Sequence, residues 1–267
     1  MSTKLGMIGG GMMGEALLSR LVFERIFDAN EILVSDPAVD RQVFLTDRYG
    51  VQATSNNVEA AQASDLLLLA IKPQIFTQVT QQILGSLNSS TVIVSILAGI
   101  SLPQLEAAFP SHAVIRAMPN TPAQVGAGVT AIARGTYVSD DQLSLAKKVL
   151  SAVGTVVEVP ESMMDAVTGL SGSGPGYIAL VVEALADGGV AVGLPRSIAQ
   201  QLAIDTVLGT AKLLKESKLH PGELKDRVTS PGGTTIAGVA MLEERGLRSA
   251  LIEAVKAATA RSKELGS

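Results

Sequence analysis

The sequence predicts an α/β protein, with a Rossmann-type doubly wound sheet followed by an all-helical dimerisation domain. Three observations support this prediction. The chain opens with an apolar strand that turns through three glycines into an Ala/Leu-rich helix. Strand and helix patterns then alternate as far as residue 162, and only helix patterns follow. We therefore expect a dinucleotide-binding domain over residues 1–162 and a helical domain over residues 163–267.

The first turn carries a glycine fingerprint, Gly9-x-Gly11-x-x-Gly14, directly after the strand predicted at 4–8. In a dinucleotide-binding turn the first glycine permits the tight bend, and the second lets the backbone approach a pyrophosphate. The third lets the helix pack closely on the strand. The alternative is an ordinary strand–helix turn whose glycines only permit close packing. The strand before the glycines and the amphipathic helix after them favour the dinucleotide interpretation.

An acidic residue follows the second predicted strand, 31–35, at the expected place. Asp36 lies 22 positions after Gly14, close to the offset of about 20 at which an acid accepts hydrogen bonds from the adenosine ribose. The alternative is a plain turn residue before Pro37. Asp36 would repel a 2′-phosphate and so favours NADH, whereas the small Ser35 could donate to such a phosphate and Arg41 lies nearby. The sequence therefore indicates NADH competence and leaves NADPH open.

The remaining elements of the first half continue the alternation. The predicted strands are 4–8, 31–35, 65–71, 91–96 and 113–117, with two more strand-like runs at 126–134 and 154–159. The predicted helices are 12–25, 38–48, 73–84, 102–108 and 140–152. Near-continuous apolar strands between helices predict a parallel sheet covered on both faces. Ligands of such sheets bind at the carboxyl ends of the strands.

The second half reads as helices, at 174–192, 195–216, 220–228, 233–245 and 247–264. The first of these carries only two charged residues, Glu183 and Asp187. A helix so apolar should be buried nearly all round. The other helices are too few to enclose it within one chain, so we infer that this domain completes its core by dimerisation.

Composition narrows the class of protein. With 267 residues, 47% of them hydrophobic, the chain has ample core for one or two domains. It contains no cysteine, which excludes disulfides, thiolate metal sites and a cysteine nucleophile. A net charge of −4 with scattered basic residues argues against a nucleic-acid partner. No apolar run reaches membrane-span length and no signal peptide is apparent, so we expect a cytoplasmic protein without a membrane or metal partner.

Two glycine- and hydroxyl-rich segments lie in the second half, at 168–175 and 228–235. Each precedes a predicted helix, where free backbone N–H groups and the helix dipole favour an anion. Both segments could therefore cradle a carboxylate. The alternative is that Ser173 and Ser230 are plain N-caps, with the glycines supplying turns.

Six motifs together resemble the pyrroline-5-carboxylate reductase family, in order from residue 4 to about 264. They are Gly9-x-Gly11-x-x-Gly14, Ala70-Ile-Lys-Pro73, Arg116-Ala-Met-Pro-Asn-Thr-Pro122, Asp165-Ala-Val-Thr-Gly-Leu-Ser-Gly-Ser-Gly-Pro175, Asp187-Gly-Gly-Val-Ala-Val-Gly-Leu-Pro195 and His220-Pro-Gly-Glu-Leu-Lys-Asp-Arg-Val-Thr-Ser-Pro-Gly-Gly-Thr-Thr235. The resemblance implies reduction of 1-pyrroline-5-carboxylate to L-proline by NADPH or NADH, the last step of proline biosynthesis. It also implies an intertwined homodimer that assembles further into a decamer.

The resemblance also implies the site residues. It assigns the binding of the substrate carboxylate and ring nitrogen to the second glycine loop, with Thr235 as the catalytic partner of the nitrogen. The substrate-binding residues are Ser230, Gly232, Gly233, Thr234 and Thr235. The cofactor-binding residues are Gly9, Gly11, Met12, Met13, Gly14, Ser35, Asp36, Asn56, Ala70, Lys72, Pro73 and Asn120. In that reading the loop of one subunit faces the nucleotide domain of its partner.

Two other functions remain open at this stage. Another imine or hydroxyacid reductase of the same two-domain plan would share the first glycine motif, but it should supply a catalytic lysine in the helical domain. Lys212, Lys215 and Lys218 are spaced like a solvated helix face. A non-catalytic dinucleotide-binding sensor would have no use for the second glycine loop.

Overall fold

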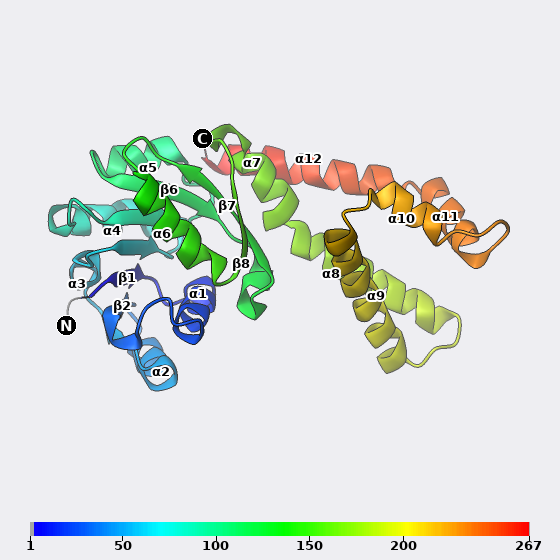
Figure 1. The fold of residues 1–267 in the computed structure, drawn as a ribbon, viewed down its shortest axis with the longest axis horizontal. Helices are drawn as coiled ribbons and strands as arrows, with labels where there is room; N and C mark the ends of the chain where they lie inside the picture. Colours follow the sequence, from blue (N-terminus) through cyan, green and yellow to red (C-terminus); the bar gives the residue numbers. More distant parts are fainter. Residues whose placement is uncertain (1–2, 267) are drawn as a thin grey trace. The chain divides into compact units, whose positions relative to one another are not determined.

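The computed structural model describes residues 3–266, which form two compact units (Figure 1). The first unit runs to Gly172 and takes in the chain again from Ala258 onward, and the second spans Ser173–Ala257. This division by packing differs from the boundary after residue 162 expected from the sequence. Because the last turns of the C-terminal helix return to the sheet unit, the chain crosses between the units twice. The boundary of the functional domains stays a prediction.

The first unit is built on an eight-stranded sheet in the order β3-β2-β1-β4-β5-β6-β7-β8. The strands are β1 Leu5–Ile8, β2 Ile32–Ser35, β3 Gln52–Thr54, β4 Leu66–Leu69, β5 Val92–Ser95, β6 Ala113–Met118, β7 Gly128–Arg134 and β8 Gly154–Glu158. All neighbouring strands pair in parallel except β6 and β7, which are antiparallel. The predicted doubly wound sheet is confirmed.

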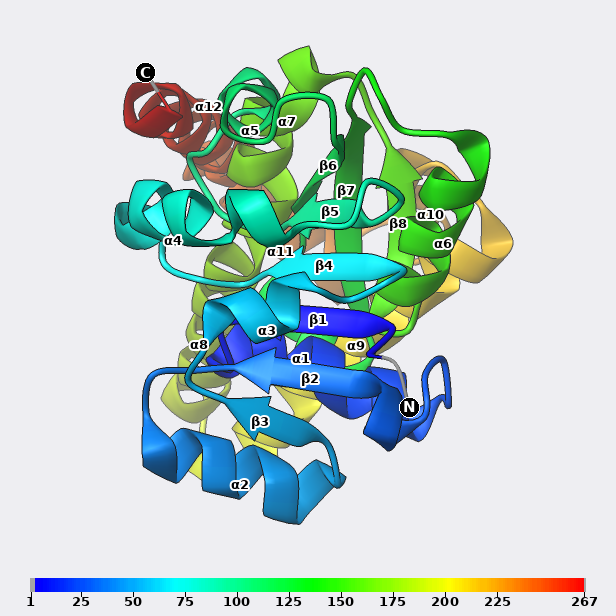
Figure 2. The same ribbon diagram turned by 90° about the vertical axis from the view of Figure 1, so that its left-hand side faces the viewer.

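Helices cover both faces of this sheet (Figure 2). They are α1 Met12–Phe23, α2 Val39–Tyr49, α3 Asn57–Ala61, α4 Phe76–Ile83, α5 Leu102–Ala108, α6 Asp140–Ser151 and α7 Met164–Val167. One core layer packs α1, α2 and α6 against the sheet, and the other packs α3, α4 and α5. Four-residue strands such as Leu66–Leu69 are wholly buried because both of their faces are covered.

The strand order reverses beside β1, which lies between β2 and β4. From β1 the chain moves outward through β2 to the edge strand β3, and it then returns to the other side of β1 as β4. The carboxyl ends of β1 and β4 therefore diverge into connections on opposite faces. In open sheets of this type a ligand binds in the crevice at such a switch point.

The second unit contains helices only. They are α8 Gly174–Ala191, α9 Arg196–Ser217, α10 Pro221–Arg227, α11 Thr234–Glu244 and α12 Leu247–Gly266, of which α12 ends in the first unit. Its small core consists of Ala186, Ala199 and Ala203. Leu180 on α8 and Leu208 on α9 are 65% and 64% exposed. The all-round burial expected for residues 174–192 is therefore not reached within one chain.

Among the described residues, no helix combines the length and the apolar character needed to span a membrane.

Candidate functional site

The glycine fingerprint lies at the switch point, and its glycines differ in what they contact. Gly9 has a φ of +102°, and a Cβ there would lie 2.4 Å from the carbonyl oxygen of Ala70. A Cβ on Gly14 would lie 2.4 Å from the carbonyl oxygen of Gly9. Both positions therefore require glycine for the fold itself.

Gly11 is the position whose glycine the surrounding protein does not explain. A Cβ on Gly11 would meet no atom within 4 Å. Gly11 is also the N-cap of α1, without a side-chain capping bond, and the next residue, Met12, is 76% exposed. The first N–H groups of a helix have no partner inside it, and the open space beside Gly11 lies at this end of α1. This arrangement fits a dinucleotide pyrophosphate that approaches the backbone at Gly11, Met12 and Met13.

Asp36 is joined to this turn. Its Oδ2 accepts a hydrogen bond of 2.9 Å from the backbone N–H of Gly10, and its Oδ1 accepts one of 3.0 Å from the N–H of Ala38. A carboxylate oxygen has two lone pairs, so each keeps one for a ribose hydroxyl. The expected ribose-binding role of Asp36 is compatible with this geometry and stays a prediction.

Ser35 and Asn56 occupy different surroundings. Ser35 is 1% exposed, and its hydroxyl donates to Oδ1 of Asn57 at 2.8 Å. Asn56 is exposed and caps α3, where its side chain accepts from the N–H of Val58 and donates to Glu59, both at 3.0 Å. Asn56 is thus open to a ligand, whereas Ser35 would have to release Asn57 to reach a 2′-phosphate. Both roles stay predictions.

Ala70, Lys72 and Pro73 follow β4 on the other side of the switch point. The N–H of Ala70 donates to the carbonyl of Ile8 at 2.8 Å, which extends the pairing of β4 with β1. Lys72 is exposed and precedes a 3-10 turn that begins at Pro73. The structure therefore brings this segment beside Gly9, and contact with a cofactor remains the prediction.

Asn120 links three segments. Its Oδ1 accepts from the N–H of Val129 at 2.9 Å, and its Nδ2 donates to the carbonyl of Ser171 at 3.2 Å. Ser171 belongs to a π-helical turn, Thr168–Gly172, which runs directly up to α8. Asn120 therefore fixes the loop after β6 to this turn. That supporting role adds to the expected nicotinamide contact, which stays a prediction.

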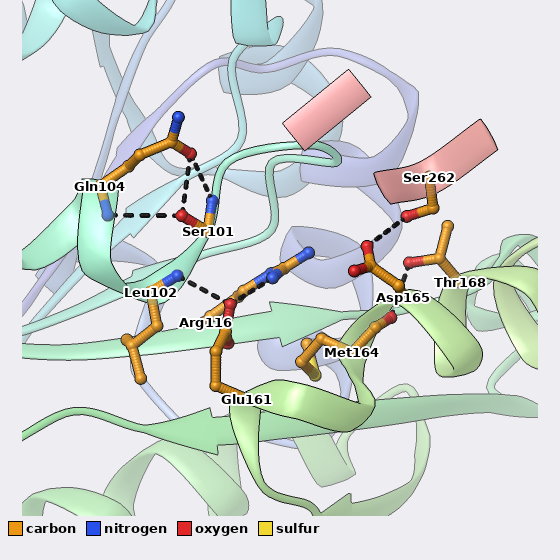
Figure 3. A network of polar contacts seen from close by, with 9 residues as sticks. All are labelled: Ser101, Leu102, Gln104, Arg116, Glu161, Met164, Asp165, Thr168 and Ser262. Atoms are coloured by element: carbon orange, nitrogen blue, oxygen red, sulfur yellow. Dashed lines mark hydrogen bonds and ion pairs between the residues drawn. The ribbon is translucent and has the colours of Figure 1, made fainter. Parts of the chain in front are cut away.

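A second polar network ties α5, β6 and the segment after β8 together (Figure 3). Arg116 is 5% exposed and forms an ion pair with Glu161, whose Oε1 also accepts from the N–H of Leu102 at 3.0 Å. Close by, the carboxylate of Asp165 accepts a hydrogen bond of 2.7 Å from the hydroxyl of Ser262 in the last turns of α12. Within the sheet unit, these contacts fasten the segment after β8 to α5 and β6 and join Asp165 to the last turns of α12.

The second glycine loop lies in the helical unit and leads into α11. A turn is closed by the N–H of Gly233, which donates to the carbonyl of Ser230 at 3.0 Å. Gly232 has a φ of +66°, and a Cβ on Gly233 would lie 2.3 Å from the Ser230 hydroxyl oxygen. The loop thus gathers the Ser230 hydroxyl with Thr234 and Thr235 at the N-terminus of an 11-residue helix. Such a site suits a carboxylate.

Sequence reasoning missed the contacts of Arg41, Glu15 and Tyr49. Arg41 donates through Nε to the carbonyl of Gly10 and pairs with Glu15, which also accepts from the Tyr49 hydroxyl at 2.7 Å. Glu15 and Arg41 are 26 positions apart. A local sequence pattern gives no signal for an ion pair between residues so far apart in the sequence.

Together, an open glycine turn at the switch point of a doubly wound sheet and a helical second unit define a dinucleotide-dependent oxidoreductase. A family profile described as "Pyrroline-5-carboxylate reductase dimerisation" matches residues 161–265, and one described as "NADP oxidoreductase coenzyme F420-dependent" matches residues 4–99. The chain is 59% identical over 266 residues to a pyrroline-5-carboxylate reductase from Synechocystis, covering 100% of this chain and 99% of the relative. The chain belongs to the pyrroline-5-carboxylate reductase family.

Solved structures agree with this assignment. A pyrroline-5-carboxylate reductase from Coxiella burnetii superposes with a TM-score of 0.93 at 34% identity, covering 99% of each chain. A pyrroline carboxylate reductase from Plasmodium falciparum, solved with NADP bound, gives a TM-score of 0.89 at 31% identity and covers 99% of this chain and 98% of the other. The resemblance found in the sequence motifs is confirmed.

Proposed function

We propose that this protein reduces 1-pyrroline-5-carboxylate to L-proline with NADPH or NADH, as the last step of proline biosynthesis. The observation that carries the proposal is family membership over the whole chain, at 59% identity to a relative of that name. The alignment includes the second glycine loop, which a nucleotide-binding sensor would not need.

The chemistry requires little proton machinery. Bound NAD(P)H supplies a hydride to the imine carbon. A protonated cyclic imine already carries the positive charge that attracts hydride, and the product amine then takes a proton from solvent. The chain has two histidines, and His220 is used as the N-cap of α10. The protein's main task is therefore to hold the two reactants in line.

The substrate is assigned to the second glycine loop. The Ser230 hydroxyl and the free N–H groups at the start of α11 bind the carboxylate, with Gly232 and Gly233 giving the backbone close access. The Thr235 hydroxyl accepts a hydrogen bond from the imine N–H and so favours the protonated, reactive form. Thr234 adds a second hydroxyl at the same helix end.

The cofactor is assigned to the sheet unit. The backbone at Gly11, Met12 and Met13 binds the pyrophosphate, and Asp36 binds the adenosine ribose. Asn56 contacts the adenosine phosphate region. Ala70, Lys72 and Pro73 lie along the ribose near the nicotinamide, which the loop at Asn120 positions.

The reaction is tested by following NADPH and NADH oxidation with pyrroline-5-carboxylate and identifying the product by chiral chromatography. We expect turnover with the cyclic imine and L-proline as product. Turnover with a 2-oxo acid instead would indicate a hydroxyacid reductase. Cofactor binding without any turnover would indicate a sensor.

The same proposal includes the assembly. The family profile for dimerisation and the exposed Leu180 and Leu208 support a homo-oligomer built through the helical unit. We assign a homodimer that assembles further into a decamer, located in the cytoplasm, with the glycine loop of one subunit serving its partner's nucleotide domain. Sedimentation at micromolar concentration tests this, and a stable monomer would contradict it.

A further inference from the structure

The peptide groups on either side of Gly10 are held by two charged side chains. The N–H of Gly10 donates to Asp36 at 2.9 Å, and its carbonyl accepts from Nε of Arg41. Gly10 is buried and immediately precedes Gly11, the N-cap of α1. We call Asp36, Arg41 and the Gly10 backbone the Gly10 clamp.

Arg41 is itself fixed by its surroundings. Its Nη2 pairs with Glu15 in the first turn of α1, and Glu15 accepts a second hydrogen bond from the Tyr49 hydroxyl at 2.7 Å. The guanidinium carbon also lies 4.9 Å from the centre of the Phe44 ring. Arg41 and Glu15 are each 26% exposed at the side chain. A partly buried arginine with contacts on several sides holds one orientation.

This arrangement determines where the next N–H points. The described chain contains no cis peptide bond, so the Gly10 carbonyl and the Gly11 N–H lie on opposite sides of one planar group. By holding the carbonyl on the side of α2, Arg41 turns the Gly11 N–H away from itself. A Cβ added to Gly11 itself would meet no atom within 4 Å, so there is open space beside this residue.

We propose that Arg41 is a positioning residue for the pyrophosphate-binding turn, acting on the dinucleotide through the Gly10 carbonyl and not as a receptor for an adenosine 2′-phosphate. Its Nε and Nη2 are engaged by the Gly10 carbonyl and by Glu15, and turning the side chain toward a 2′-phosphate would break both contacts. Arg41 also neutralises Glu15, an anion in the first turn of the helix that must receive the pyrophosphate. The inference rests on the proposed dinucleotide-dependent function.

The test compares Arg41→Met with Arg48→Met. Arg48 lies on the same helix, 6.0 Å from the same Phe44 ring, and contacts Tyr49, so it matches Arg41 in charge and stacking without a bond to Gly10. Binding of NADPH and of NADH is measured directly by nicotinamide fluorescence without imine, together with steady-state kinetics and the thermal midpoint of each variant.

For Arg41→Met we expect both dissociation constants to rise by the same factor, roughly tenfold for one lost charge-assisted hydrogen bond. The KM for the imine should change less than about twofold. Arg48→Met removes a contact to the Tyr49 hydroxyl but none to Gly10 or Glu15, so it should change both dissociation constants far less than Arg41→Met does. A loss confined to NADPH would show that Arg41 reads the 2′-phosphate and would overturn the proposal. Unchanged binding of both cofactors would overturn it as well.

Should Arg41→Met fail to fold, the variants Tyr49→Phe and Arg41→Lys test in its place whether Arg41 positions the turn. Removing the Tyr49 hydroxyl loosens Glu15 and should weaken NADH and NADPH equally, by a smaller factor. Lysine keeps the charge but lacks the fork that spans Gly10 and Glu15, so it should restore binding only in part. A lowered thermal midpoint with unchanged binding would indicate a purely structural role. Because binding is read without imine, failure of the reductase assay is distinguishable from failure of the clamp.

Discussion

The carboxylate of Asp36 accepts a 2.9 Å hydrogen bond from the backbone N–H of Gly10, so the acid after β2 is joined to the glycine turn between β1 and α1. This bond and the one from the N–H of Ala38 hold the carboxylate in place, beside the site where we expect the adenosine ribose. A fixed carboxylate repels a 2′-phosphate more strongly than a mobile one that can turn away. We therefore predict that Asp36 largely determines the preference of the protein between NADH and NADPH.

Replacing Asp36 with asparagine should shift the preference toward NADPH. The amide is nearly isosteric and its oxygen keeps one of the two backbone N–H bonds of Asp36, while the repulsive charge is lost. We expect the ratio of kcat/KM for NADPH to that for NADH to rise about tenfold, the effect of removing roughly 1.4 kcal/mol of repulsion. The exposed Asp40→Asn on α2 is the charge-matched control and should leave the ratio unchanged. A wild-type enzyme with strong NADPH preference would contradict the argument.

The glycines of the fingerprint should separate folding from binding. Gly11→Ala places a methyl group in open space, and the φ of −66° at Gly11 suits alanine. We expect an unchanged thermal midpoint and a KM for the cofactor raised at least about tenfold, because the methyl blocks the approach of the pyrophosphate. Gly14→Ala should instead lower the thermal midpoint, since its Cβ would lie 2.4 Å from the Gly9 carbonyl. Wild-type cofactor affinity in Gly11→Ala would remove that glycine from the site.

Thr235→Ala tests the substrate loop. Loss of a charge-assisted hydrogen bond to the imine nitrogen, worth about 1.5 kcal/mol, should lower kcat/KM by roughly tenfold or more. Thr235→Ser keeps the hydroxyl and should recover most of that loss. The KM for NAD(P)H should stay constant in both variants. Unchanged kinetics in Thr235→Ala would exclude the hydroxyl from the mechanism.

The ion pair between buried Arg116 and half-buried Glu161 should matter for stability. Arg116 is 5% exposed, and Glu161 Oε2 is buried without a hydrogen-bond partner in the described chain. Arg116→Met leaves the Glu161 charge unpaired, so we expect the free energy of unfolding to fall by about 3 kcal/mol. Adding Glu161→Gln should recover part of this loss because the stranded charge is removed. Urea unfolding of the single and double variants measures both effects, and strict additivity would show that the pair is not coupled.

The sequence predicted the sheet well where burial alone determines the strand. Leu66–Leu69 is buried on both faces, and such a run is recognisable without any long-range information. β3 and α3 were not predicted. β3 is a three-residue edge strand with an exposed Gln52, and α3 has five residues, so neither carries a periodic pattern. Short edge elements depend on neighbours that a local pattern does not show.

The residues of the candidate site also divide into those that the sequence predicted and those that required the fold. The glycine fingerprint and Asp36 follow from spacing, because one strand–helix unit and the next strand fix their separation. The substrate loop at Ser230 and Thr235 was assigned only through family resemblance, since physical reasoning could not separate a carboxylate cradle from an N-cap. The pairing of Arg41 with the Gly10 carbonyl required the fold, because it joins residues 31 positions apart.

The contact between Glu15 and Arg41 predicts a dependence on acid pH. Burial raises the pKa of Glu15, but the hydrogen bonds from Arg41 and Tyr49 outweigh it, so the pKa lies below its ordinary value of 4.5. A carboxyl group with a lowered pKa contributes stability that is complete above the ordinary value and is lost as the pH falls through the lowered one. The wild type should therefore be more stable than Glu15→Gln at neutral pH, and the difference should shrink below pH 4.5. Urea unfolding between neutral and acid pH measures it, with the exposed Glu59→Gln as control, and a difference that stays constant into the acid range would show that the Glu15 charge does not stabilise the fold.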